Sequence, residues 1–101
     1  MSVVDVEIIA ADTIQVVSGP FNTIGPRAII AGPILSDGEG VKIQTTHNGL
    51  VWQDFYLNGV LQELLPKHTM ITILGPGLFR VVKSVTAVPV SVTYWKSESD
   101  A

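Results

Sequence analysis

Apolar and polar residues alternate along most of this chain with a period of two. Val41-Lys42-Ile43-Gln44-Thr45 is the clearest such run, and a period of two indicates a β-strand with one buried face. Val, Ile and Thr are abundant in these runs, while Gly, Pro and Asn-Gly fall between them, which is typical of strands joined by turns. The pattern predicts strands over residues 3–9, 13–17, 28–31, 41–45, 50–57, 60–65, 70–74, 78–84 and 88–95.

Two Asn-Gly pairs, Asn48-Gly49 and Asn58-Gly59, punctuate the middle of the chain. Asn-Gly between apolar runs is the strongest short-range signal of a β-hairpin, because both residues tolerate a positive φ. We therefore predict a three-stranded meander over residues 41–65. One alternative stays open, because Gln62-Glu63-Leu64-Leu65 also fits a helical turn before Pro66.

About eight short strands at a spacing of roughly 8–12 residues favour an all-β architecture. The chain has 101 residues, which is enough for one hydrophobic core. We predict one antiparallel two-sheet sandwich, jelly-roll-like, over residues 1–95. A polar C-terminal tail over residues 96–101 is expected to fray.

Charge is scarce, because Asp, Glu, Lys and Arg make up only 15% of the residues and the net charge is −3. The mean hydropathy is +0.41, so much of the surface is uncharged, which suggests that a partner covers part of it. Without a basic stripe we expect no nucleic-acid partner. No apolar run is long enough to cross a membrane, and the N-terminus lacks the basic segment of a signal peptide, so we expect synthesis in the cytoplasm.

Few residues suggest catalysis, and we expect that the protein is not an enzyme and uses no cofactor or metal. Cysteine is absent. His47 falls in a predicted turn and His68 in a predicted loop, so neither joins a metal-ligand or acid–base pattern. The paired acids do not indicate a catalytic site either. Asp5 and Glu7 occupy the polar face of a predicted strand, and Asp37 and Glu39 lie in a glycine-rich turn. A cupin-type enzyme, which needs several converging His and acid ligands, is the weakest alternative.

Asp54 is the most notable polar residue, because it lies mid-strand on the same face as Trp52 and Tyr56. This trio suits a carbohydrate- or ligand-binding module, in which aromatic rings form a platform beside a carboxylate. We favour a structural role, with Arg80 as the partner of Asp54.

The first and last strands are the best candidates for a partner interface. If either is the edge of a sheet, it can accept a strand from another subunit, and tryptophan is enriched where subunits meet. We therefore expect interface residues at Val3, Val4, Val6, Ile8, Tyr94 and Trp95.

Four segments together resemble small structural proteins of tailed bacteriophages. They are residues 40–44 (GVKIQ), residues 48–55 (NGLVWQDF), Gly59-Val60 and residues 73–83 (ILGPGLFRVVK). The resemblance implies a jelly-roll or Ig-like capsid decoration (cement) protein. Such a protein stabilises the virion by binding the major capsid protein on the assembled head, commonly as a homo-oligomer (a dimer or trimer). A tail or head-fibre accessory protein is the alternative within the same group.

Overall fold

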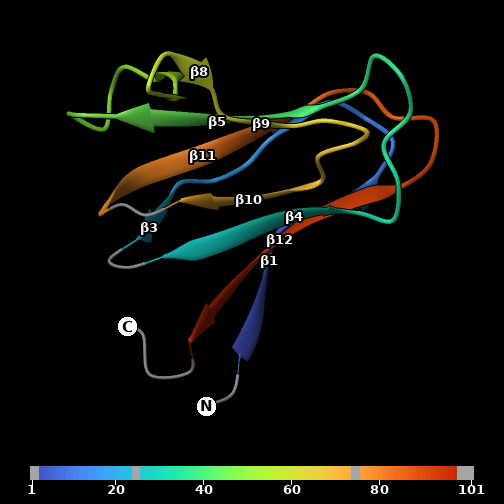
Figure 1. Cartoon of the computed structure of the whole chain (residues 1–101), viewed down its shortest axis with the longest axis horizontal. Helices are drawn as coiled ribbons and strands as arrows, with labels where there is room; N and C mark the ends of the chain where they lie inside the picture. The colour runs from blue at the N-terminus through green and yellow to red at the C-terminus, as the bar shows by residue number, and fades with distance from the viewer. Residues whose placement is uncertain (1–2, 24–25, 74–75, 98–101) are drawn as a thin grey trace.

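The computed structural model describes residues 3–23, 26–73 and 76–97, and all the regular elements in these ranges are β-strands (Figure 1). The described residues include no helix long and apolar enough to span a membrane. The strands are β1 (Val3–Asp12), β2 (Val16–Val17), β3 (Phe21–Thr23), β4 (Arg27–Gly32), β5 (Val41–Thr46), β6 (Gln53–Asp54), β7 (Tyr56–Leu57), β8 (Val60–Leu61), β9 (Glu63–Leu64), β10 (Met70–Ile73), β11 (Gly77–Lys83) and β12 (Val90–Ser97).

The strands form two antiparallel sheets and a small hairpin. The first sheet has the order β1-β12-β4-β10. In the second sheet, β11 and β5 are central: β2 and β3 both pair with β11, and β6 and β9 both pair with β5. The hairpin β7–β8 stands apart from both sheets, and Figure 1 shows it above the layer formed by β5 and β11.

The strand order is that of a jelly roll. Because β2 and β3 pair with successive parts of β11, they act as one interrupted strand, and β6 and β9 do the same beside β5. Apart from the hairpin β7–β8, the other ten segments then occupy eight positions, in which the first pairs with the last, the second with the seventh, the third with the sixth and the fourth with the fifth. This folded long hairpin, wrapped into two sheets, confirms the predicted all-β sandwich, although with more strand segments than expected.

The core fills the space between the two sheets. Alternate residues point inward along each central strand, as Phe79 and Val81 do on β11 and Val90 and Val92 on β12. The buried apolar side chains come from both layers, so each sheet buries one face against the other.

The predicted meander over residues 41–65 is corrected by the structure. β5 is a regular strand, but its neighbour is broken: Gln53–Asp54 pairs with one end of β5, Glu63–Leu64 with the other, and the hairpin β7–β8 is inserted between them. The main chain bridges the break, since Phe55 N–H donates to Ile43 O (2.9 Å) and Ile43 N–H to Gln62 O (3.1 Å). Residues 62–65 therefore complete an edge strand rather than a helical turn.

Several strands also differ from the prediction in their extent. β12 begins at Val90 and runs to Ser97, so the first two residues of the predicted polar tail are part of a strand; residues 98–101 lie outside the described part of the chain. The short strand β3 was missed, because Pro20 and Pro26 flank it closely. Leu74 and Gly75 of the predicted strand and corner also lie outside the described residues.

Candidate interaction surface

The loop between β5 and β6 is held by its own side chains. Thr46 Oγ1 donates to Val51 O (2.6 Å) and accepts from Gly49 N–H (3.0 Å). Asn48 Oδ1 accepts from Leu50 N–H (2.8 Å) and Val51 N–H (3.0 Å). Gly49 takes a φ of 77°, which favours glycine at this point of the turn. These bonds fix a loop in which two apolar side chains stay in water, Leu50 at 83% exposure and Val51 at 68%, beside the half-buried Trp52.

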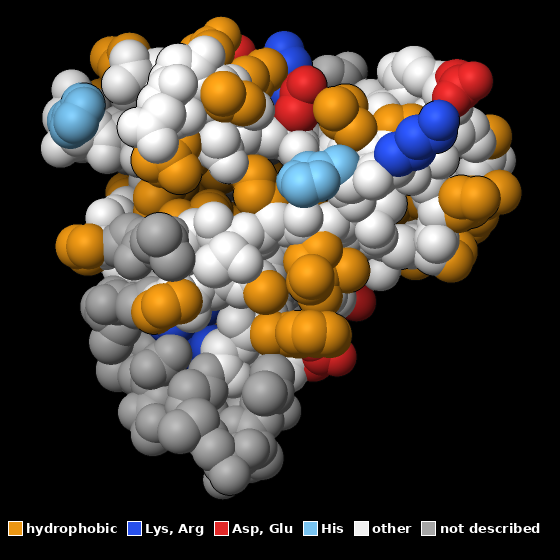
Figure 2. All heavy atoms as spheres, viewed as in Figure 1, with side chains coloured by type: hydrophobic (Ala, Val, Ile, Leu, Met, Phe, Trp, Pro, Cys, Tyr) orange, Lys and Arg blue, Asp and Glu red, His pale blue; other side chains and the backbone are white. Residues whose placement is uncertain are grey.

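The inserted hairpin β7–β8 presents a second group of exposed apolar residues. Asn58 (φ 54°) and Gly59 (φ 79°) form its turn with two positive φ angles, which is the geometry that suits a tight hairpin. Tyr56, Leu57 and Val60 are exposed on it, and Figure 2 shows hydrophobic side chains at the surface over this part of the molecule. We call the five residues Leu50, Val51, Tyr56, Leu57 and Val60 the apolar lobe.

The predicted pair of Asp54 and Arg80 is joined through a third residue. Gln44 of β5 lies between them in the second sheet, in register with both. Its Nε2 donates to Asp54 Oδ1 (3.1 Å), and its Oε1 accepts from Arg80 Nε (2.8 Å). The row Asp54–Gln44–Arg80 therefore ties three strands together beneath the lobe.

The proposed aromatic platform does not form as a free row. The guanidinium carbon of Arg80 lies 4.7 Å from the centre of the Trp52 ring, so one face of that ring is already occupied. Trp95 lies in the first sheet, whereas Trp52 packs on a residue of the second sheet. Of the three residues Trp52, Asp54 and Tyr56, only Tyr56 on the inserted hairpin has an exposed ring.

The two histidines occupy separate places. His47 lines an open hollow of about 560 Å³ beside the lobe, together with residues of β5, β6, β7 and β11. His68 lies in the turn between β9 and β10, where its N–H and carbonyl exchange hydrogen bonds with Leu65 (2.9 Å each). Among residues 3–23, 26–73 and 76–97, no three His, Cys, Asp or Glu side chains gather closely enough to hold a metal ion.

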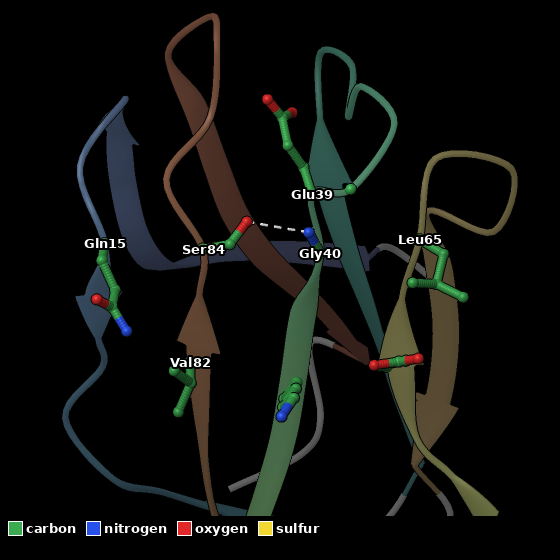
Figure 3. A pocket seen from close by; sticks show the side chains of 9 residues that line it. Gln15, Glu39, Gly40, Leu65, Val82 and Ser84 are labelled. Carbon is green, nitrogen blue, oxygen red and sulfur yellow. Dashed lines mark hydrogen bonds between the residues drawn. The ribbon is translucent and has the colours of Figure 1, made fainter.

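A second hollow, of about 300 Å³, lies at the other end of β5 (Figure 3). The carboxylate of Glu39 borders it but is engaged elsewhere: Ser36 N–H donates to Oε1 and Ala87 N–H to Oε2, both at 2.7 Å. Figure 3 shows this side chain turned away from Val82 and Leu65. Glu39 therefore ties two loops together. Asp37, its predicted companion, is exposed in the turn.

The predicted interface strands differ in position. β1 is the outermost strand of the first sheet, but β12 lies between β1 and β4 and is therefore not an edge. The contact of Tyr94 and Trp95 with a partner stays a prediction. Tyr94 points inward, with its ring stacked on Phe21 at 5.5 Å, and Trp95 is partly exposed on the opposite face. Val6 and Ile8 are half-buried, while the side chains of Val3 and Val4 lie outside the described part.

The apolar lobe was not foreseen from the sequence. Residues 50–57 were predicted to form one strand, which would have buried alternate members of the set. The two Asn-Gly pairs, ten residues apart, could have indicated that this segment is not one strand. A chain that turns twice within ten residues leaves little room for a long strand between the two turns.

Comparisons with known proteins give no family for this chain. No family model matches it, and neither the curated proteins nor the solved structures yield a significant match.

Proposed function

We propose that this protein acts by surface contact rather than by catalysis, as a decoration protein that binds the assembled head of a tailed bacteriophage. The major capsid protein would be its partner and the virion its place of action. The single observation that carries this proposal is the apolar lobe, where five large apolar side chains are exposed on an ordered loop and hairpin.

The physical argument concerns the cost of holding these side chains in water. Leu50 and Val51 would lower the free energy of folding if they were buried, yet the bonds of Thr46 and Asn48 hold their loop outward. A preordered loop loses little conformational entropy on binding, so its apolar contacts contribute more fully to affinity. The arrangement suits a contact anchor, and exposed apolar patches commonly mark such sites.

Attachment to a symmetric shell suits a small contact of this kind. A protein that binds the assembled shell and not the free subunits stabilises the shell by mass action. Many identical sites add their contributions, so each copy needs only a modest interface. The jelly roll itself agrees with this role, but the same fold also serves lectins and cupins, so the lobe, not the fold, supports the proposal.

The test is co-sedimentation with heads assembled from the major capsid protein of a tailed bacteriophage. We expect the wild type to sediment with assembled shells and not with free capsid subunits. The double variant Leu50→Ser/Val51→Ser should lose this binding. Ile34→Ser/Val85→Ser is a matched control, because these residues are comparably exposed but lie in loops at the other end of the sandwich, and it should bind normally. The proposal is wrong if the wild type stays in the supernatant, or if both double variants bind equally well.

A further inference from the structure

The N-terminal half of β1 has the properties of a docking edge. β1 is the outermost strand of the first sheet, and it pairs with β12 in unbroken register from Val3↔Ser97 to Glu7↔Thr93. Irregularities begin only beyond Glu7. A regular edge strand offers a row of N–H and C=O groups to a further strand, and bulges, prolines and charged side chains are the usual means of blunting it. Bulges and prolines are missing from residues 3–7, and the charged residues there are the two acids Asp5 and Glu7.

The two faces of this edge differ in chemistry. Val6 lies opposite Tyr94, whose ring stacks on Phe21 of the second sheet, so Val6 faces the interior. Asp5 and Glu7 lie on the outer face, opposite Trp95 and Thr93, and both are exposed. An added strand would therefore meet two carboxylates on one face and a mixed surface on the other, where Val6 and Tyr94 lie on the same face as Lys96, the register partner of Val4.

A hollow of about 230 Å³ opens on the inner side of the same edge. Val6, Glu7 and Ile8 of β1 line it, together with Tyr94 and the segment Gly19, Pro20 and Phe21 that leads into the second sheet. Its volume is several times the ~30 Å³ that one water molecule occupies in the liquid, so it accommodates an aliphatic side chain. The hollow is a second observation, independent of the carboxylates, that points to a bound strand.

We propose that β1 accepts an extended segment of a partner protein in which Lys or Arg alternates with an apolar residue. Its basic residues would lie opposite Asp5 and Glu7, and the apolar residue between them would enter the hollow beside Val6 and Tyr94. Main-chain hydrogen bonds supply affinity in this mode, and the alternating side chains supply specificity. The inference deepens the proposed function by naming the chemistry of a partner contact, and it rests on that function only in requiring a protein partner.

A second copy of this chain is a poor occupant of the same edge. Antiparallel self-pairing centred on Val6 sets Asp5 against Glu7 of the other copy. Moving the centre by one residue sets Asp5 against Asp5 or Glu7 against Glu7. Like charges directly opposite each other destabilise a strand pair, so the acids that favour a basic segment also oppose self-association here.

The experiment uses short peptides as probes and the full chain labelled for NMR. The probe is a nine-residue peptide of alternating Lys and Val, and an alternating Glu and Val peptide is its control. Two further probes carry N-methyl groups on all Lys or on all Val residues. In a strand, residues of one face direct their N–H groups to the same side, so one methylated peptide should bind like the parent and the other should fail. Backbone amide shifts should concentrate at residues 3–8 and 94–95.

Protein variants locate the contact. Asp5→Asn and Glu7→Gln should each weaken binding about two- to fivefold, as for exposed ion pairs, while Asp37→Asn, an exposed acid far along the chain, should not. Gly19→Leu should weaken binding further, because a Cβ at Gly19 meets nothing within 4 Å and a side chain there narrows the hollow without unfolding the protein.

Equal binding of the Glu–Val peptide, equal binding of both methylated peptides, or amide shifts centred on the apolar lobe would overturn the inference. So would protection of the β1 amides by self-association in the absence of peptide. None of these results touches the co-sedimentation test, which depends on Leu50 and Val51, so the two proposals fail separately.

Discussion

At one end of the sandwich four aromatic rings form a row between the sheets, beside a loop held by Thr46 and Asn48, whereas the other end has a buried lysine and a glutamate that bind main-chain groups of the loops. The row runs from Phe55 to Phe79 (5.3 Å between ring centres), on to Phe21 (6.4 Å) and then to Tyr94 (5.5 Å). It spans the second sheet from its broken edge to β3 and reaches β12 of the first sheet. This end is closed by apolar packing.

The polar end uses directional bonds to main-chain groups. Lys83, fully buried at the end of β11, donates from Nζ to Ile14 O (2.7 Å) and Ser84 O (3.2 Å). Glu39 joins two loops through Ser36 and Ala87, and Gly40 N–H donates to Ser84 Oγ (3.0 Å). The loops pair some of their main-chain groups with each other, as where Ser84 N–H donates to Gly40 O (3.0 Å), and side chains bind others.

The difference between the ends suggests that the two kinds of interaction have different structural roles. Directional bonds fix the loops of the polar end in one geometry. At the aromatic end, packing between rings secures the strands, and the neighbouring loop and hairpin are left to present the apolar lobe. Substitutions at the two ends should therefore differ in size and in character.

The largest effect should come from Phe79→Ala at the aromatic end. Phe79 is the central ring, in contact with both Phe55 and Phe21, and its removal leaves a cavity that the sheets cannot close. We expect a loss of about 3–5 kcal/mol in the free energy of unfolding, measured by urea denaturation. Tyr56→Ala, which removes an exposed ring from the hairpin, is the control and should cost about 0.5 kcal/mol or less. Equal losses would show that the row does not hold this end together.

A smaller effect should follow from Lys83→Met at the polar end. Methionine keeps the apolar stem but removes the ammonium, so the carbonyl groups of Ile14 and Ser84 lose their donor inside the protein. We expect a loss of about 1–3 kcal/mol, the usual cost of an unpaired buried polar group. Lys42→Met, on the adjacent strand but exposed, should change stability little. A more stable Lys83→Met protein would mean that desolvation of the ammonium outweighs its bonds.

The sequence was sufficient to predict the sandwich, because the alternation of apolar and polar residues that marks a strand is a local property. The alternation along residues 78–84 puts Phe79 and Val81 on one face of the strand, and the structure buries that face. Asn58-Gly59 marked a tight turn, and both residues have the positive φ that such a turn needs. The same alternation also puts position 83 inward, but nothing local indicates that a lysine there would find carbonyl partners from residues as distant as Ile14.

The candidate surfaces were harder to predict, because they depend on strand order. Arg80 was expected as the partner of Asp54, but only the order β6-β5-β11 shows that Gln44 lies between the two residues and binds both. The edge position of β1 and the central position of β12 follow from long-range pairing that two similar terminal strands do not reveal. The inserted hairpin could not be predicted for the same reason, because its position depends on which segments pair with β5.

The smallest of the three effects should come from Glu39→Gln, which probes how sharply the polar end depends on charge. Glutamine keeps one oxygen for Ser36 or Ala87 but turns an amide N–H toward the other donor, so one bond is replaced by two facing donors. We expect a loss of about 1 kcal/mol in urea denaturation and faster hydrogen exchange at the affected amide. Asp37→Asn, which changes the same charge in the same turn, should leave both measurements unchanged. If the two variants behave alike, net charge rather than the tie between the loops accounts for the stability of this end, and the contrast with the aromatic end is weaker than the structure suggests.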